Sequence, residues 1–167
     1  MLIFLVGYMG SGKSSFGKKL ALKLHLQFLD LDTYIEEQSQ MNITEIFDTK
    51  GEAHFRALEH DALIKLSQEN NLVLATGGGT PCYYENMILM NKKGITVYLQ
   101  SSSELLLSRL KKSKKERPLL KDKTEEELKM FIEKSLAERE VFYSKAKYIM
   151  DAKNANADQL AMALQHK

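Results

Sequence analysis

The chain has 167 residues, of which 44% are hydrophobic, and it carries a formal net charge of +2. This length allows one sizeable hydrophobic core and is short for two, so we expect a single domain over residues 1–167. The small charge argues against nucleic acid as a partner, and no stretch approaches the roughly 20 apolar residues of a membrane-spanning helix.

Cysteine content and the first residues of the chain bear on its compartment. A single cysteine, Cys82, excludes an internal disulfide bond and is typical of a reducing compartment. The N-terminus lacks the basic region and the small-residue cleavage site of a signal peptide. We therefore expect a cytoplasmic protein whose lone thiol, without an identified base partner, is unreactive.

The N-terminal segment combines a buried strand with a glycine-rich loop. Residues 2–6 (LIFLV) are apolar on both alternating faces, as in a parallel-sheet strand that helices cover on both sides. Residues 7–14 (GYMGSGKS) then have the spacing GxxxxGK[ST] of a phosphate-binding loop, and a helical pattern follows. From residue frequencies, a chance match in a chain this short is on the order of one in a hundred.

The residue types of this loop fit a nucleoside triphosphate. Glycines let successive backbone N–H groups surround phosphate oxygens, and the following helix directs its positive end at the same anion. Lys13 is expected to contact the β- and γ-phosphates as a catalytic residue, and the Ser14 hydroxyl to be a direct Mg²⁺ ligand. The loop residues expected to bind the nucleotide are Gly10, Ser11, Gly12, Lys13, Ser14 and Ser15.

The second predicted strand, residues 28–31, leads to the acids Asp30 and Asp32. On a strand their side chains would project to the same side, at the carboxyl edge where open α/β sheets bind ligands. Because Mg²⁺ takes few protein ligands, Asp30 is expected to reach the metal through water, and Asp32 to accept or orient the proton of an attacking hydroxyl. Alternatively, these acids only cap a helix at Thr33, which forms a capping-box pattern with Glu36.

A long helical pattern covers residues 42–66 and is interrupted near Gly51. In its second half, Arg56 and Glu59 lie three residues apart and off the apolar stripe, so they can pair. Arg139 lies on another well-patterned helix. A planar guanidinium suits a carboxylate, so two such arginines in one pocket would indicate an acidic small molecule; two surface arginines in ordinary ion pairs are the alternative.

The remaining elements alternate between strands and helices. Further strands are expected at residues 72–75, 95–99 and 148–150, and helices at residues 85–91 and 157–164, after a cap at Ser101, and from a capping box at Thr124 to about Tyr143. Residues 77–79 are three consecutive glycines, which let a ligand or backbone approach closely. This alternation predicts an α/β protein, a three-layer α/β/α sandwich with a parallel sheet.

Residues 111–123 form a basic segment that contains Arg117 and Pro118. Such a charge run is usually a solvated surface. Because the Arg-Pro pair cannot lie inside a regular helix, the segment is expected to be a mobile loop. Beside a phosphate-binding loop it could close as a lid, exclude water and bring Arg117 to the charge that develops on the transferred phosphate.

Together these motifs resemble the shikimate kinase family over nearly the whole chain. The similar segments are the phosphate loop at residues 7–15, DLD at 30–32, the G-E-x-x-F-R-x-x-E pattern at 51–59, TGGG at 76–79, RPLL at 117–120 and the R-x-x-x-Y pattern at 139–143. Many NTPases share the phosphate loop, whereas the other five in this order and spacing are highly specific.

The resemblance implies transfer of the γ-phosphoryl group of ATP to the 3-hydroxyl of shikimate, with Mg²⁺, on the pathway to aromatic amino acids. It implies a P-loop NTPase fold with five parallel strands in the order 2-3-1-4-5, a substrate-binding segment at about residues 32–61 and a lid at about 111–123. The implied shikimate contacts are Asp32, Arg56, Gly78 and Arg139, with Glu59 holding Arg56, Phe47 and Phe55 lining the pocket, and Arg117 reaching ATP as a catalytic lid residue. Arg109 is a candidate for a second basic lid residue.

Two other functions remain open at this level. Another small P-loop kinase, for gluconate or a nucleoside monophosphate, would share the loop, although the two arginines, DLD and GGG suit a carboxylate-bearing polyol better than a nucleobase. A non-catalytic ATP-sensing module would not need Asp32 or Arg139. We expect a monomer whose partners are shikimate and ATP, and neither nucleic acid nor a membrane.

Overall fold

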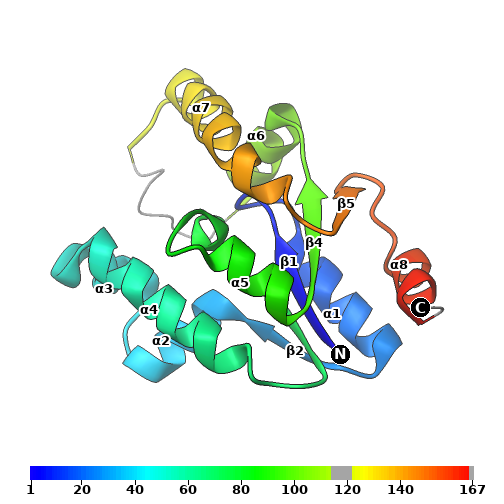
Figure 1. Ribbon diagram of the computed structural model, residues 1–167. Helices are drawn as coiled ribbons and strands as arrows, with labels where there is room; N and C mark the ends of the chain where they lie inside the picture. The colour runs from blue at the N-terminus through cyan, green and yellow to red at the C-terminus, as the bar shows by residue number, and fades with distance from the viewer. Residues whose placement is uncertain (114–121, 166–167) are drawn as a thin grey trace.

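The computed structural model describes residues 1–113 and 122–165, and its centre is a parallel β-sheet (Figure 1). The strands are β1 (Leu2–Val6), β2 (Gln27–Asp30), β3 (Leu72–Ala75), β4 (Ile95–Gln100) and β5 (Tyr148–Asp151). They form a five-stranded sheet in the order β2-β3-β1-β4-β5, and every neighbouring pair is parallel. This confirms the predicted fold class and strand order.

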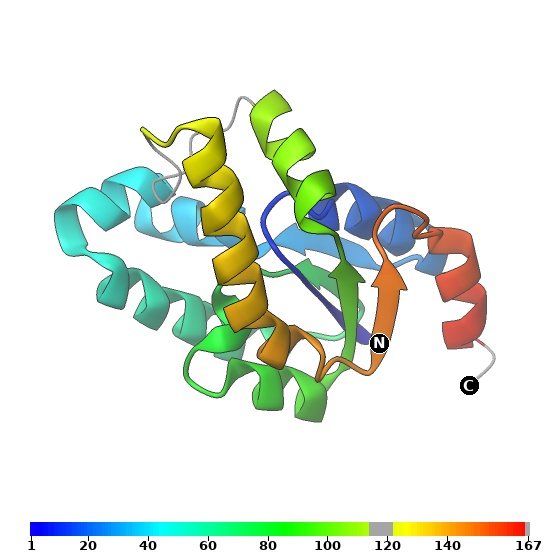
Figure 2. The same cartoon turned by 90° about the horizontal axis from the view of Figure 1, so that it is seen from above.

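Helices cover both faces of the sheet, as the two views show (Figures 1 and 2). They are α1 (Lys13–Leu24), α2 (Leu31–Ser39), α3 (Ile43–Lys50), α4 (Glu52–Leu66), the 3-10 helix η1 (Thr80–Cys82), α5 (Asn86–Lys93), α6 (Ser103–Lys112), α7 (Glu125–Tyr143) and α8 (Ala157–Gln165). None of the helices in the described part of the chain has the length and apolarity that a membrane crossing requires.

The central strand β1 is buried along its whole length because its two faces belong to two separate cores. Ile3 and Leu5 pack with apolar residues of α1 and α8 on one side of the sheet. Phe4 and Val6 pack on the other side with residues from α2 to α7. Successive strand residues point to opposite faces, so a strand between two helical layers must be apolar at every position.

Most predicted element ends lie within two residues of the observed ones. Gly51 separates α3 from α4 with a left-handed φ of 84°, and the capping box at Thr124 is present. The prediction that Ser101 caps α6 is wrong by one residue. The cap is Ser102, whose hydroxyl accepts a hydrogen bond from the Leu105 N–H at 3.2 Å, because Ser101 is buried where β4 ends.

Candidate active site

The loop between β1 and α1 has the backbone geometry that its glycines predict. Gly10 and Gly12 have φ values of 82° and 94°, a left-handed conformation that side chains disfavour. Gly12 directly precedes α1, and no side chain of the described residues caps this helix. The first N–H groups of α1 therefore remain available to an anion at the positive end of the helix.

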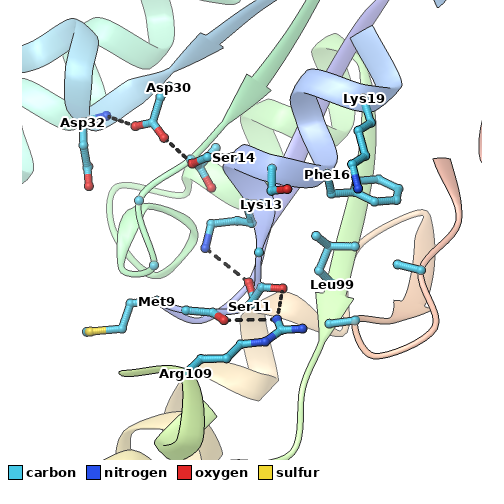
Figure 3. A pocket seen from close by; sticks show the side chains of 18 of the residues that line it. Met9, Ser11, Lys13, Ser14, Phe16, Lys19, Asp30, Asp32, Leu99 and Arg109 are labelled. Atoms are coloured by element: carbon cyan, nitrogen blue, oxygen red, sulfur yellow. Dashed lines mark hydrogen bonds between the residues drawn. The ribbon is translucent and has the colours of Figure 1, made fainter. Parts of the chain in front are cut away.

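Lys13 lies inside the loop and is 9% exposed. Its ammonium group donates hydrogen bonds to the carbonyl oxygens of Gly7 at 2.7 Å and Tyr8 at 2.9 Å. It also lies 3.5 Å from the Ser11 hydroxyl (Figure 3). A positive charge is thus held at the centre of the loop by the backbone oxygens that surround it.

Arg109 reaches the same loop from α6. Its Nη1 donates hydrogen bonds to the carbonyl oxygens of Gly10 at 3.2 Å and Ser11 at 2.9 Å (Figure 3). The sequence placed Arg109 only as a candidate lid residue. Its position against the phosphate loop could not be found from local spacing, because its partners lie 98 and 99 positions away in the chain.

Asp30 connects the end of β2 to both Ser14 and α2. Its Oδ2 accepts a hydrogen bond from the Ser14 hydroxyl at 2.6 Å, and its Oδ1 accepts from the N–H group of Asp32 at 3.1 Å (Figure 3). The same Oδ1 accepts from the N–H group of Thr33 at 3.4 Å. Asp30 is therefore the N-cap of α2. The side chains of Ser14 and Asp30, both predicted to take part in metal binding, are therefore hydrogen-bonded to each other.

The predicted geometry of Asp30 and Asp32 needs a correction. The two acids do not share a strand, because β2 ends at Asp30 and α2 begins at Leu31. Thr33 is consequently not an N-cap but a residue of the first helical turn. Asp32 also lies in this turn and reaches the carboxyl edge of the sheet from a helix.

A cleft of ≈ 550 Å³ runs along this edge of the sheet (Figure 3). One part is lined by the phosphate loop, and the glycine run, Asp30 and Asp32 lie beside it. The other part is lined by Leu99, Arg109, Ala152 and Ala155. The cleft therefore joins an anion-binding end to a less polar end with one guanidinium group, as a nucleotide requires.

The glycine run 77–79 is where the predicted substrate residues come together. A Cβ atom at Gly77 would lie 3.1 Å from Oδ1 of Asp32, and one at Gly78 would lie 3.2 Å from Nη1 of Arg139. A Cβ at Gly79 would lie 2.5 Å from Nη1 of Arg56, which is closer than atoms can approach. Three polar side chains thus approach three consecutive residues, and any side chain on this run would displace them.

Arg56 and Glu59 form the predicted pair on α4, and both are buried. Nη1 of Arg56 lies 2.6 Å from Oε2 of Glu59, and the residues are 5% and 1% exposed. Burial raises the pKa of the Glu59 carboxyl, against the opposing charge of Arg56. Burial by itself lowers the pKa of Arg56, but Glu59, Tyr83 and Glu52 together outweigh it and the pKa is raised. The guanidinium therefore keeps its charge at the pocket.

Aromatic rings surround Arg56. Its guanidinium lies 4.5 Å from the centroid of the Tyr83 ring and 5.3 Å from that of Phe55. Phe47 and Phe55 have ring centroids 4.9 Å apart. Sequence reasoning missed Tyr83, which follows η1 and has no spacing relation to α4. These rings contact the guanidinium group, whose charge is paired with the carboxylates of Glu59 at 2.6 Å and Glu52 at 3.1 Å.

Arg139 comes from α7, on the other side of the glycine run. Its guanidinium lies 5.3 Å from the centroid of the Tyr8 ring, and the Tyr8 hydroxyl bonds to Ser135 at 2.6 Å. Tyr143, one turn further along α7, donates a hydrogen bond to the carbonyl oxygen of Gly78. These contacts fasten α7 to the phosphate loop and to the glycine run, so Arg139 has a defined position.

Cys82 ends η1 near both arginines. Burial raises the pKa of its thiol to about 11, although Arg139 and Arg56 act in the opposite direction. The thiolate is therefore a minor species at neutral pH, in line with the expected unreactive thiol.

Arg117 and the central part of the predicted lid lie outside the described residues. Within those residues α6 ends at Lys112, and α7 begins at Glu125. No group of three or more His, Cys, Asp or Glu residues in the described chain could hold a metal ion by itself. A metal at Ser14 and Asp30 would need most of its ligands from water or phosphate, which is the coordination that Mg²⁺ favours.

The strand order, the GxxxxGK[ST] loop between β1 and α1, and the polar pocket beside it define a P-loop kinase. A sequence model with the description "Shikimate kinase" matches residues 9–167. The chain belongs to the shikimate kinase family.

Named relatives agree with this assignment. The chain is 45% identical over 166 residues to a shikimate kinase of Azobacteroides pseudotrichonymphae, covering 99% of this chain and 98% of the relative. The crystal structure of shikimate kinase from Bacteroides thetaiotaomicron has a TM-score of 0.91 at 42% identity, covering 99% and 97% of the two chains. Shikimate kinase from Acinetobacter baumannii in complex with shikimate has a TM-score of 0.86 at 36% identity, covering 99% and 90%.

Proposed function

We propose that this protein transfers the γ-phosphoryl group of ATP to the 3-hydroxyl of shikimate, giving shikimate 3-phosphate and ADP in aromatic amino acid biosynthesis. The observation that carries this proposal is the convergence of Asp32, Arg56 and Arg139 on the glycine run beside the phosphate loop. An acid, two guanidinium groups and a phosphate cradle thus meet at one sheet edge, in a chain of the shikimate kinase family.

ATP is proposed to lie along the cleft with its phosphates in the loop at residues 10–15. The N-terminus of α1 and the Lys13 ammonium group supply the positive charge there. Lys13 would exchange its contacts with the loop carbonyl oxygens for contacts with the β- and γ-phosphates. The adenine would then occupy the other end of the cleft, between Arg109 and the segment that carries Ala152 and Ala155.

Mg²⁺ is proposed to be held by Ser14 directly and by Asp30 through water. This proposal rests on the contact of 2.6 Å between their oxygen atoms and on their position beside the phosphate loop. The hard oxygen donors suit this ion, and the site leaves room for phosphate ligands. When bound, the ion would neutralise charge on the phosphates.

Shikimate is proposed to bind against the glycine run, with its carboxylate on Arg56 and Arg139. The absence of a side chain at residue 78 lets the Arg139 guanidinium lie directly against the glycine run, where a Cβ atom would be 3.2 Å from its Nη1. Asp32 would then face the attacking hydroxyl and accept its proton, or orient it toward the γ-phosphate. Arg117 is retained as a proposed catalytic residue of a lid over the transferred phosphoryl group, although it lies outside the described residues.

We further propose that the enzyme is a monomeric single domain located in the cytoplasm. The first part is supported by the glycine run, which Asp32, Arg56 and Arg139 of a single chain all approach. The second part is supported by the need for ATP and by the single cysteine.

The proposed function is tested by ADP release from Mg-ATP with shikimate, quinate, gluconate or AMP as the acceptor. We expect release with shikimate at a rate far above the rate without acceptor, and shikimate 3-phosphate as the product. Release with gluconate or AMP alone would indicate a different small-molecule kinase. Binding of ATP without release for any acceptor would indicate a nucleotide-sensing module, and either result would reject the proposal.

The substitution Arg139→Ala is expected to raise the KM for shikimate about 10- to 100-fold, because a hydrogen bond to a charged group is lost. The KM for ATP should change little, since Arg139 belongs to α7 and the nucleotide end of the cleft does not include it. Steady-state kinetics with each substrate varied will measure the difference. Lys134→Ala, at an exposed position of α7, is the matched control. Equal increases for both substrates would reject the assigned role.

A further inference from the structure

A chain of hydrogen bonds continues from Glu59 through η1 to α5 and back to α4. Oε1 of Glu59 accepts from the Thr80 hydroxyl at 2.6 Å. The carbonyl oxygen of Thr80 accepts from Nδ2 of Asn86 at 2.9 Å, and Oδ1 of Asn86 lies 2.7 Å from Nδ1 of His60. Oε2 of Glu59 accepts from Nη1 of Arg56 at 2.6 Å, whereas Nη2 and Nε of the same guanidinium donate to Glu52 at 3.1 and 3.4 Å. These hydrogen bonds therefore join Nη1 of Arg56 to an imidazole four residues further along α4.

The direction of each hydrogen bond follows from the donors present. A carbonyl oxygen can only accept, so the amide nitrogen of Asn86 must face Thr80. Oδ1 of Asn86 therefore faces His60, and Nδ1 of His60 must carry the proton. Each polar group between His60 and Arg56 is thus either a donor or an acceptor in this network. Exchanging donor and acceptor at any of them would break a hydrogen bond.

The middle of this chain is sealed from water. Thr80 and Asn86 are both 0% exposed, and Glu59 is 1% exposed. A buried polar group that loses its partner keeps the full cost of leaving water. The Thr80 hydroxyl therefore restricts where the Glu59 carboxylate can lie, and both of its oxygen atoms are already committed.

His60 also contacts the turn at residues 84–85, which directly precedes Asn86. Tyr84 and Glu85 both have left-handed backbones, with φ values of 50° and 56°, which residues with a Cβ disfavour. The ring of Tyr84 stacks on that of His60, with centroids 4.9 Å apart and planes 22° apart. His60 thus contacts this turn twice, through the stack and through Asn86.

We propose that Thr80, Asn86 and His60 are positioning residues that hold the Glu59 carboxylate, and through it the Arg56 guanidinium, in the orientation that binds an acidic substrate. None of the three residues lines the nucleotide cleft. These three residues fix the orientation of the Arg56 guanidinium in the protein without substrate. For its kinetic consequence the inference rests on the proposed function, because shikimate supplies the carboxylate.

The decisive variant is Thr80→Val, which removes the hydroxyl and keeps nearly the same volume. We expect the KM for shikimate to rise about tenfold, with the KM for ATP changing less than about twofold. Thr80→Ser restores the hydroxyl and should restore the KM. The control is Thr96→Val, since Thr96 is also 0% exposed and its hydroxyl also donates a hydrogen bond of 2.6 Å, to Asn91; because it accepts a further bond from the Lys147 N–H at 2.8 Å, this control is at least as disruptive to the fold.

A second pair of variants tests His60, the partly buried end of this hydrogen-bond network, without creating a cavity in the core. His60 is only partly buried, so His60→Ala should fold. It should raise the KM for shikimate about threefold, because Asn86 loses one of its two partners. His60→Asn keeps an N–H donor near the position of Nδ1 and should restore most of the wild-type value.

A readout that needs no turnover separates this inference from the proposed function. In isotope-labelled protein, the NMR signals of the Arg56 guanidinium can be assigned by their loss in Arg56→Lys. We expect separate signals for its NH₂ protons in the wild type, Thr80→Ser and Thr96→Val, because a guanidinium held in a fixed ion pair rotates slowly. In Thr80→Val the signals of the Nη1 protons, which face Glu59, should merge or broaden, whereas Nη2 keeps its ion pair with Glu52.

The outcomes divide as follows. A wild-type protein that ignores shikimate would reject the proposed function, and the guanidinium signals would still decide the inference. Unchanged signals in Thr80→Val and in His60→Ala would overturn it. Equal increases in the KM values for shikimate and ATP, or an equal effect of Thr96→Val, would also overturn it, because they would indicate only a general loss of structure.

Discussion

The substitution Lys13→Met is expected to lower the turnover rate about 100- to 1,000-fold while the protein remains folded. The ammonium group is proposed to stabilise the charge on the β- and γ-phosphates, and removal of one such donor typically costs this much. Methionine has a similar length and can fill the same space inside the loop. Rates at saturating ATP and shikimate will measure the loss, and thermal unfolding will check the fold.

Lys23→Met is the matched control for this variant. Lys23 lies on the same helix, but it is exposed and pairs with Asp158 at 2.7 Å, far from the loop. It should retain the wild-type rate, because an exposed ion pair contributes little. A Lys13→Met protein with a rate close to that of wild type would contradict the role of the loop as a phosphate cradle in catalysis.

Asp32→Asn is expected to lower the turnover rate about 100- to 10,000-fold, the usual contribution of a positioned general base. The amide has the size of the carboxylate but cannot accept the proton of the attacking hydroxyl. ATP binding should persist, since the phosphate loop is unchanged. Turnover at saturating substrates and ATP binding by calorimetry will test both expectations together.

The control for this substitution is Asp61→Asn, at an exposed position of α4. It makes the same chemical change away from the cleft and should leave the rate unchanged. If Asp32→Asn only raised the KM for shikimate and left the rate at saturation intact, Asp32 would bind substrate without taking part in proton transfer. That outcome would reject its catalytic assignment.

Local patterns in the sequence were sufficient for the fold class and for most of the individual helices and strands, but not for the order of the strands. The wholly apolar residues 2–6 indicated a strand buried on both faces, and Gly51 indicated a break in the helical pattern; both predictions are confirmed. The strand order came from a likeness to a family, because period and capping describe each element alone. The end of β2 was misjudged, since the Asp30 side chain caps α2 and the helix begins before Thr33.

The candidate site divides in the same way. The phosphate loop is continuous in sequence, so its function could be read from its spacing. The pairing of Arg56 with Glu59 followed from their separation of one helical turn. Their burial did not follow, because it depends on η1 and on the turn at Tyr83, which come from another part of the chain.

The sequence by itself determined what depends on neighbours along the chain: the phosphate loop, the helix caps and the alternation of strands with helices. Only the tertiary structure decided that Arg109 lies on the phosphate loop, and that Asp32 and Arg139 meet at the glycine run. The physical reason is the distance along the chain over which each kind of interaction acts. Local hydrogen bonding and side-chain period act over a few residues, whereas a pocket forms from segments that are brought together only by packing of the sheet and its helices.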